Sequence, residues 1–436
     1  RLRQRIVLQG RYPCLKSEPE LNATPDFVRD PRMMRGSNHT GMRQFNERIV
    51  LQAIRHHGAM AKADLARLTQ LSAQTVAIIV SRLEGDDLLI KQERIRGKIG
   101  QPSVPLSLNP DGAFSLGLQV GRRSLEVLAS DFTGQVRHRL EFHYPYPDPA
   151  VVLPRIEQGL AQIRALMGEP AWARTVGIGL TAPLSMDKWS DLLGDDAAQV
   201  LQRWQEIDLP AAVQALTELP VEFAKDTTAA CMAEMLQGHG RSVNSFLYVF
   251  VGTFIGGGVV LSGHIVQGIR GNAGAIGSMP AGLSHSSDSA RLKAKGQPPQ
   301  LLQLASGWQL EQALEKAGLD PHLAHQDAIM EPAYAAFTTP WLAQASAALA
   351  MTVTSAAALM DLDAVVIDGS LGRSLIDALI EATRSQLQHY NLEGLHPPRV
   401  MAGQIGAHAR ALGGSLLPMH KQFFPVKDIF LKQDLV

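Results

Sequence analysis

The sequence predicts an α/β protein in two parts: an N-terminal winged helix-turn-helix, and a larger domain in which strands and helices alternate. Three observations support this fold class. Three short helical patterns follow one another from residue 43, a basic segment containing a glycine comes after them, and strand and helix patterns alternate from residue 113 to residue 420. Such alternation is typical of α/β domains with mixed sheets, and 436 residues are enough for two or three domains.

Charge and cysteine content narrow the class of protein. The formal net charge is zero, so a surface that binds nucleic acid would have to be local. The two cysteines, Cys14 and Cys231, form neither a disulfide framework nor a zinc site, which favours a reducing, cytoplasmic location. The first residues lack the apolar core of a secretory signal. The apolar stretches 246–263 and 345–367 contain a glycine run and two aspartates, respectively, so we expect core elements there and no membrane partner.

The three helical patterns have the spacing of a helix-turn-helix. The first ends at Gly58, the second covers residues 62–69, and the third begins after Ser72, a favourable N-cap residue. The third helix buries apolar residues at offsets of three, four and seven, namely Val76, Ile79, Val80 and Leu83. Its outward side chains include an amide, which can pair with adenine, and small groups, which can touch a thymine methyl. The expected DNA-contacting residues of this part are Ser72, Ala73, Gln74, Thr75, Ile78 and Arg82.

A strand followed by a basic tip predicts a wing after the third helix. Residues 88–90 are apolar, and the next segment carries Arg94, Arg96 and Lys98 around a glycine. These cations are placed to contact DNA phosphates or a minor groove. An ordinary three-helix bundle with a charged face is the alternative, and the Ser72 cap together with the basic wing favours DNA binding.

Strand and helix patterns of the larger domain begin after a turn signal at residues 109–112. Helices are expected at 228–236, 342–360 and 375–389, among others. Strands are expected at 114–120, 125–130 and 136–143, which form a meander, and near 176–180, 221–224, 246–251, 258–261, 364–367 and 399–401.

Four stretches of this domain carry a family resemblance: 177–183 (GIGLTAP), 225–230 (KDTTAA), 252–260 (GTFIGGGVV) and 271–278 (GNAGAIGS). In their order and spacing they resemble the repressor, ORF, kinase (ROK) family, and residues 35–38 (RGSN) resemble its regulator branch. The likeness covers residues 34–418. It implies a two-lobed actin-like ATPase fold, related to ribonuclease H, that assembles as a homodimer or homotetramer.

Some residues of these stretches are candidates for contacting a small effector. Glycines between 252 and 258 let the backbone approach a phosphate or a sugar, and a hairpin that needs positive φ is the alternative. Asp226 follows a strand whose carboxyl end should face a ligand crevice, and a simple helix N-cap is the alternative. The resemblance implies that in family kinases the matching aspartate is the base for the sugar hydroxyl. The expected effector contacts are Thr181, Asp226, Gly256, Gly257 and Asn272.

The departures from the family pattern concern catalysis. The resemblance implies Asp-x-Gly-Gly-Thr where this chain has residues 119–123 (QVGRR), and Gly-Glu-x-Gly-His where it has 274–278 (GAIGS). The family's cysteine-rich zinc loop has no counterpart, a further glutamate is replaced by Leu302, and an asparagine by Lys225. Phosphoryl transfer depends on positioning and charge neutralisation at the phosphates. We therefore expect no enzyme activity, no catalytic residue, no metal site and no cofactor.

The resulting hypothesis is a sequence-specific transcriptional regulator, in the sense of a repressor, that binds a double-stranded DNA operator and a sugar-like effector. A ROK sugar kinase, or a regulator whose large domain is structural and binds nothing, are the alternatives. The expected division is a disordered leader at 1–33, the winged helix-turn-helix at 34–105, the ROK domain at 106–420 and a tail at 421–436.

Overall fold

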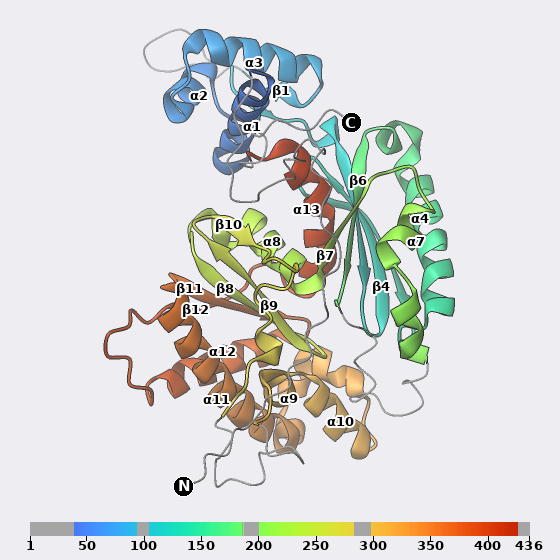
Figure 1. Ribbon diagram of the computed structural model, residues 1–436, viewed down its shortest axis with the longest axis vertical. Helices are drawn as coiled ribbons and strands as arrows, with labels where there is room; N and C mark the ends of the chain where they lie inside the picture. Colours follow the sequence, from blue (N-terminus) through green and yellow to red (C-terminus); the bar gives the residue numbers. More distant parts are fainter. Residues whose placement is uncertain (1–38, 94–103, 185, 187–199, 283–297, 426–436) are drawn as a thin grey trace, which may run out of the picture. The chain divides into compact units, whose positions relative to one another are not determined.

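Two five-stranded sheets organise the larger part of the chain in this computed structural model, which describes residues 39–93, 104–184, 186, 200–282 and 298–425 (Figure 1). The first sheet has the strand order β5-β4-β3-β6-β7 and the second β10-β9-β8-β11-β12. We call residues 113–225 the first lobe and residues 246–402 the second lobe. The arrangement agrees with the two-lobed fold that the sequence predicts.

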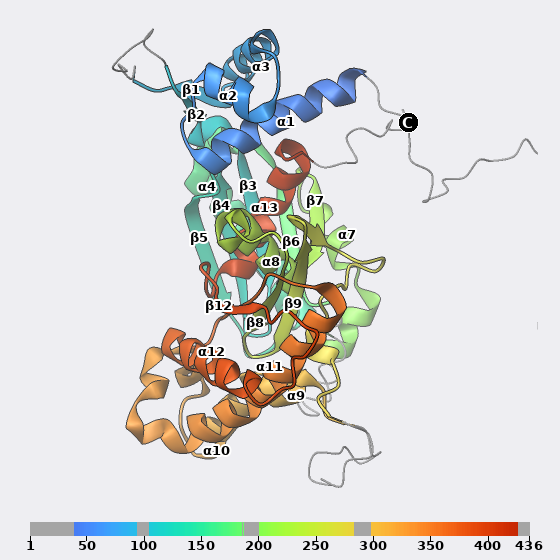
Figure 2. The ribbon, with the colours of Figure 1, turned by 90° about the vertical axis from the view of Figure 1, so that its left-hand side faces the viewer.

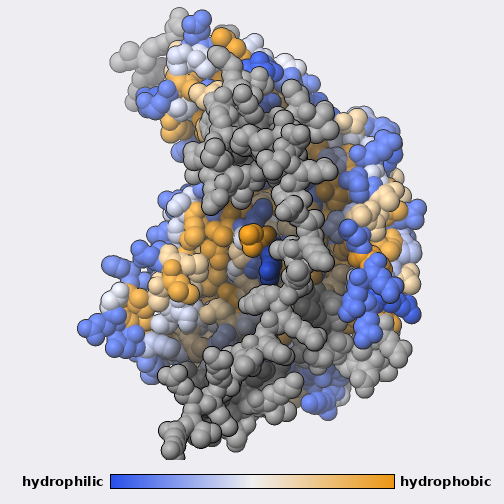
Figure 3. All heavy atoms as spheres, viewed as in Figure 1, coloured by the Kyte–Doolittle hydropathy of each residue, from blue (hydrophilic) through white to orange (hydrophobic). Residues whose placement is uncertain are grey.

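The first sheet contains the expected meander. Its strands are β3 (Phe114–Val120), β4 (Ser124–Asp131), β5 (Val136–His143), β6 (Thr175–Ala182) and β7 (Val221–Lys225). Strands β3 to β5 pair antiparallel, whereas β6 and β7 run parallel to β3. Helix α4 (Pro149–Trp172) covers the outer face of this sheet, and the short α7 (Leu209–Gln214) lies close to it (Figure 1). The exposed surface on the side of α4 is mostly hydrophilic (Figure 3).

The inner face of the first sheet is built for close contact with a helix. Successive strand residues point to opposite faces, so Leu116 and Leu118 pack in the core cluster that includes α4, while Ser115 and Gly117 face α13 (Ala409–Phe423). A Cβ atom on Gly117 would lie 2.1 Å from the carbonyl oxygen of Ala411. The backbone of α13 therefore lies directly against the backbone of the sheet.

The second sheet is buried on both faces. Its strands are β8 (Phe246–Val251), β9 (Ile255–Leu261), β10 (His264–Val266), β11 (Ala364–Gly369) and β12 (Arg399–Ala402). In β8, Leu247 and Val249 pack with α11 (Ala335–Met360) and α12 (Arg373–Leu387), and Tyr248 packs on α8 (Asp226–Gln237). Figure 2 shows α11 and α12 on the side of these strands opposite to α8 and α13. Two shorter helices, α9 (Leu301–Ala305) and α10 (Trp308–Lys316), complete the second lobe.

Helix α11 is the most apolar long helix of the described residues. By length and composition the segment Pro332–Met360 could cross a membrane, and 50% of its most apolar window is buried within the protein. Trp341, Ala345 and Leu349 belong to the core cluster that holds β8 and β11. This packing agrees with the expectation of core elements in the stretch 345–367.

Three helices and a two-stranded hairpin form the N-terminal module. Helix α1 (His39–His57) precedes α2 (Lys62–Thr69) and α3 (Ala73–Gly85), and the expected interior residues of α3 are buried. The hydroxyl of Ser72 accepts a hydrogen bond from the backbone N–H of Thr75 at 3.1 Å, so Ser72 caps α3 as expected. Strand β1 (Leu89–Lys91) pairs antiparallel with β2 (Leu106–Leu108), so the hairpin extends beyond the boundary expected at residue 105. Arg94, Arg96 and Lys98 lie outside the described residues, as does the leader 1–33.

We expect Gly179→Ala to destabilise the protein, because the new Cβ would lie 1.8 Å from the carbonyl oxygen of Gly414 in α13. Overpacking of this kind costs about 1–3 kcal/mol or more. The measurement is the urea midpoint of the full chain. Gly85→Ala is the matched control: nothing lies within 4 Å of its Cβ position and it lies at the end of a helix, so its midpoint should stay the same or rise. An unchanged midpoint for Gly179→Ala would contradict the described contact between α13 and the sheet.

Candidate functional site

A cavity of about 920 Å³ opens between the two lobes. Its lining takes side chains from the β3–β4 turn, the start of α8, strand β9 and the start of α13. Four of the five expected effector contacts line it: Asp226, Gly256, Gly257 and Asn272. The carboxyl ends of the inner strands thus meet at a cleft, as the sequence suggests for an open α/β fold.

The fifth expected contact, Thr181, does not line the cavity. Its side chain is fully buried on the face of β6 that packs on α13, within 3.0 Å of the position that a Cβ on Gly414 would take. Thr181 is the penultimate residue of β6, and the alternation of side chains along the strand turns it toward α13. Thr181 is therefore part of the packing of α13, and its expected role as an effector contact does not fit this geometry.

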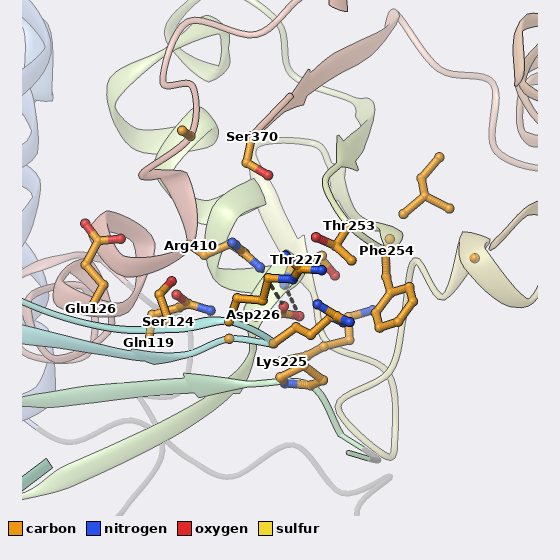
Figure 4. Close-up of a pocket in the computed structure, with 18 of the residues that line it drawn as sticks. Gln119, Ser124, Glu126, Lys225, Asp226, Thr227, Thr253, Phe254, Ser370 and Arg410 are labelled. Carbon is orange, nitrogen blue, oxygen red and sulfur yellow. Dashed lines mark hydrogen bonds and ion pairs between the residues drawn. The ribbon is translucent and has the colours of Figure 1, made fainter. Parts of the chain in front are cut away.

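Asp226 is the first residue of α8 and lies near two cations, Lys225 and Arg410. Its Oδ1 accepts a hydrogen bond from the backbone N–H of Thr227 at 2.7 Å, and its Oδ2 lies 3.7 Å from Nη1 of Arg410. Figure 4 shows Arg410 reaching toward Asp226 from α13. The carboxylate lines the cavity, as expected for a residue that faces a ligand crevice, whereas the N-cap residue of α8 is Lys225 and not Asp226.

Lys225 stands beside Asp226, at the end of β7. Its Nζ donates to the carbonyl oxygen of Ala273 at 2.9 Å and to Oδ1 of Asn272 at 3.5 Å. Burial lowers the pKa of Lys225, and the neighbouring Asp226 opposes that shift. The side-chain oxygen of Asn272 therefore lies within hydrogen-bond distance of the ammonium group of Lys225.

The glycine-rich stretch forms the turn and the second strand of the β8–β9 hairpin: Gly252 lies in the turn, and residues 256–258 belong to β9. Gly256 pairs with Phe250 and Gly257 with Val249, and none of the glycines from 252 to 258 has positive φ. A Cβ on Gly256 would lie 2.8 Å from Cγ2 of Thr227, at the start of α8. These glycines allow α8 to approach the sheet closely, which neither sequence interpretation anticipates.

Two arginines of the β3–β4 turn reach the second lobe. The guanidinium of Arg122 lies 4.8 Å from the ring centroid of Trp308, and burial lowers the pKa of Arg122 to about 10. Nη2 of Arg123 lies 3.6 Å from Oε2 of Glu311. Trp308 and Glu311 both belong to α10. The β3–β4 turn, where the family resemblance implies a phosphate site, therefore contacts the second lobe through these two residues.

Glu311 is the centre of a small buried network. Its Oε1 accepts a hydrogen bond from Oγ1 of Thr253 at 2.7 Å and lies 3.1 Å from Nε2 of His325. Burial opposes ionisation of Glu311, but the hydrogen bonds from His325 and Thr253 and the charge of Arg123 outweigh it, so its pKa is lowered. Sequence reasoning does not find Glu311, since its partners are far apart along the chain.

The exposed face of α3 carries the residues expected to contact DNA. Ser72, Ala73 and Gln74 are exposed, Thr75 is half-buried, and Ile78 is 63% exposed. Arg82 is exposed too, and its Nη1 donates to Oε1 of Glu47 at 3.0 Å. A single exposed apolar side chain such as Ile78 is common on protein surfaces, so the candidate interface rests on the whole exposed face of α3.

The N-terminal module and the ROK-like part share one hydrophobic cluster. It joins residues of α1 to α3 with Phe132 of the first lobe and with Met419, Phe423 and Phe424 at the carboxyl end of α13. Arg48 of α1 donates to the carbonyl oxygens of Lys421 and Phe424 at 2.9 and 3.0 Å. The last turn of α13 is thus capped by the helix-turn-helix module.

A reciprocal contact runs in the other direction across this junction. Nη2 of Arg241 donates to the carbonyl oxygen of His56, at the end of α1, at 2.7 Å. Arg55 lies against Phe424, 4.3 Å from its ring centroid.

Burial, together with the charge of Arg55 and other nearby cations, lowers the pKa of His420 to about 4, so this histidine is neutral near pH 7.

The described residues hold no group of three or more histidine, cysteine, aspartate or glutamate side chains that could bind a metal. Of the two cysteines, Cys231 is buried in α8 against β9. The segment where the family's zinc loop would fall lies partly outside the described residues.

Two lobes with a cleft between them and helices α8 and α13 along the inner faces define a protein of the actin-like ATPase class. Residues 115–421 match the model of the ROK family, and the chain belongs to that family. A xylose repressor of Bacillus spizizenii is 24% identical over 247 residues, which cover 56% of this chain and 62% of that repressor. The Escherichia coli DNA-binding transcriptional repressor Mlc is 24% identical over 227 residues, 52% of this chain and 55% of Mlc. The aligned regions thus span less than two thirds of either repressor.

Solved structures show the same fold. A ROK family transcriptional regulator, homologous to Mlc of Escherichia coli, superposes with a TM-score of 0.64 at 20% identity, covering 88% of this chain and 98% of that chain. A ROK family glucokinase of Streptomyces griseus, in complex with glucose and AMPPNP, gives a TM-score of 0.53 at 19% identity, covering 70% of this chain and 99% of that chain. The family therefore contains both regulators and kinases, and the chemistry of the cleft has to decide between them.

Proposed function

We propose that this protein is a transcriptional repressor that binds an operator through its winged helix-turn-helix and a small sugar-like effector through the cleft between its lobes. The observation that carries the proposal is the path of α13. Arg410 near the amino end of this helix faces Asp226 in the cleft, and Phe423 at its carboxyl end lies in the core of the N-terminal module. One helix therefore contacts the candidate effector cleft at one end and the hydrophobic core of the N-terminal module at the other.

The contacts proposed for DNA are those of α3 and the wing. Gln74 and Ile78 are exposed at the start and middle of α3, where a recognition helix contacts base edges. Arg94, Arg96 and Lys98 of the wing remain proposed phosphate or minor-groove contacts. Helix-turn-helix proteins usually read paired half-sites, so a homodimer or homotetramer is part of the proposal, as is a cytoplasmic location.

The cleft supports a sensor in preference to a kinase. Phosphoryl transfer needs groups that hold and neutralise the phosphates. Here Gln119 occupies the strand position of the expected aspartate, and Arg123 of the neighbouring turn is paired with Glu311. Asp226, the residue matching the catalytic base, is held beside Arg410. We propose that the chain binds its ligand without transferring a phosphoryl group.

Gln74→Ala should relax the sequence preference of operator binding, because a bidentate amide contact discriminates between bases by about 1–3 kcal/mol, or roughly 5- to 150-fold in affinity. Lys98→Ala should weaken binding to operator and unrelated DNA alike and should reduce the salt dependence. The measurement is gel-shift titration of a promoter fragment, chosen by footprinting, against a scrambled fragment at several salt concentrations. Equal effects of the two variants on specificity would contradict this division of roles.

The kinase alternative rests on Asp226, and a turnover assay tests it. We expect no ATP-dependent phosphorylation of glucose, xylose, fructose or N-acetylmannosamine by the full chain, and no difference between the wild type and Asp226→Asn. Release of ADP that depends on a sugar and is lost in Asp226→Asn would overturn the proposal that the cleft is only a sensor.

A further inference from the structure

The cleft between the lobes has an excess of positive charge. Among the described residues, its lining includes five lysine or arginine side chains, namely Arg122, Arg123, Arg139, Lys225 and Arg410. The same lining includes three carboxylates, namely Glu126, Glu141 and Asp226. A neutral sugar carries no charge that could balance this excess of cations.

Each carboxylate of the lining already has a cation beside it. Oε1 of Glu126 lies 2.8 Å from Nε of Arg139 and 3.3 Å from Nδ1 of His408. Oε2 of Glu141 lies 3.1 Å from Nη2 of Arg139. Asp226 lies beside Arg410. The negative charge of the cleft is therefore compensated before any ligand binds.

Two cations of the lining form no ion pair among the described residues, although Asp226 acts on the charge of Lys225, and Glu311 and Glu315 act on that of Arg122. Within the described part of the chain, no carboxylate oxygen lies within 4.0 Å of Lys225 or Arg122, whereas Arg123, Arg139 and Arg410 each have at least one. Lys225 is held by two neutral oxygens, those of Asn272 and Ala273. Nε and Nη1 of Arg122 are buried and have no hydrogen-bond partner among the described residues.

Unpaired charges that are partly removed from water are costly, and a ligand of opposite charge offsets that cost. Guanidinium and ammonium groups are also the usual protein receptors for carboxylate and phosphate groups. The cavity, about 920 Å³, has room for a monosaccharide derivative.

We propose that the effector is an anion, either a sugar acid or a phosphorylated sugar, whose carboxylate or phosphate group is received by Lys225 and Arg122. This inference rests on the proposed function, because it names the chemical class of the effector that the same cleft would sense. It also gives a role to the two positions at which the chain departs from the family's asparagine and phosphate turn.

The experiment compares matched neutral and anionic compounds on the full chain: glucose, gluconate, glucose 6-phosphate, xylose, xylonate and inorganic phosphate. Binding is measured by calorimetry, and thermal unfolding reports stabilisation. We expect at least one anionic sugar to bind about 10-fold or more tightly than its neutral parent, as one charge-assisted contact would give. Gluconate and xylonate report a carboxylate, and glucose 6-phosphate reports a phosphate.

Four variants test which side chains cause the preference for anionic ligands. Lys225→Gln and Arg122→Gln should each remove most of the preference for the anion. Lys225→Arg should retain it, which also shows that the site tolerates substitution. Lys316→Gln is the matched control, since it removes the same charge from an exposed position on α10 outside the cavity lining and should bind like the wild type.

Several results would overturn the inference: neutral sugars that bind as tightly as their acids and phosphates, an anion preference that survives both glutamine variants, or no binding of any anionic compound at millimolar concentration. Binding of inorganic phosphate that is lost in the same variants supports the anion site and shows that the sugar contributes little. Operator release by a neutral sugar would refute the inference and leave the proposed function intact. Anion binding without specific operator binding would refute the proposed function alone.

Discussion

The contact on which the rest of the structure depends is the packing of α13 against backbone. A Cβ on Gly413 would lie 1.7 Å from the carbonyl oxygen of Ala229 in α8, and one on Gly179 would lie 1.8 Å from that of Gly414. Helix and sheet approach each other without side chains between them, and interiors packed this closely transmit displacement instead of absorbing it. The helix runs about 20 Å from Arg410 to Phe423 at 1.5 Å per residue. It links the ligand cleft to the core of the helix-turn-helix.

Much of the fold could be predicted from the sequence, because buried strands are visible in the sequence as short runs or alternations of apolar residues. The meander, β8 and β11 fall where the apolar patterns lie. Helix α13 is absent from the expected elements, since Gly413, Gly414 and Pro418 resemble a break in a helix. Those residues are explained only by the tertiary contact with β3, β6 and α8, which no local pattern contains.

The candidate site was predictable in part for a similar reason. Asp226 could be found because it follows a strand in a recognisable motif, and it lines the cleft. Thr181 belongs to an equally recognisable motif, but the alternation of β6 turns it toward α13. Trp308, Glu311 and Arg410 were not found, because their contacts join segments that are remote in sequence. The exposed face of α3 needed only helical periodicity.

Two sets of charged contacts, one in the cleft and one at the junction with the N-terminal module, support the proposed function. The formal net charge is zero, but arginines lie in the cleft where the family resemblance implies a phosphate turn. At the junction with the N-terminal module, Arg48 and Arg241 donate hydrogen bonds to carbonyl oxygens at helix ends on the opposite side. In the proposed function, the first arrangement binds a ligand without phosphorylating it, and the second joins the proposed DNA-binding module to the helix that reaches the cleft. If an effector changes the affinity for an operator, linkage requires that the operator changes the cleft in return.

Hydrogen exchange on the full chain, free and bound to an operator fragment identified by footprinting, tests this coupling most directly. The account predicts altered protection in α2 and α3, along α13, and in the first turn of α8 around Asp226, although no DNA reaches the cleft. A change confined to the helix-turn-helix, with α13 and α8 exchanging as in the free protein, would contradict it.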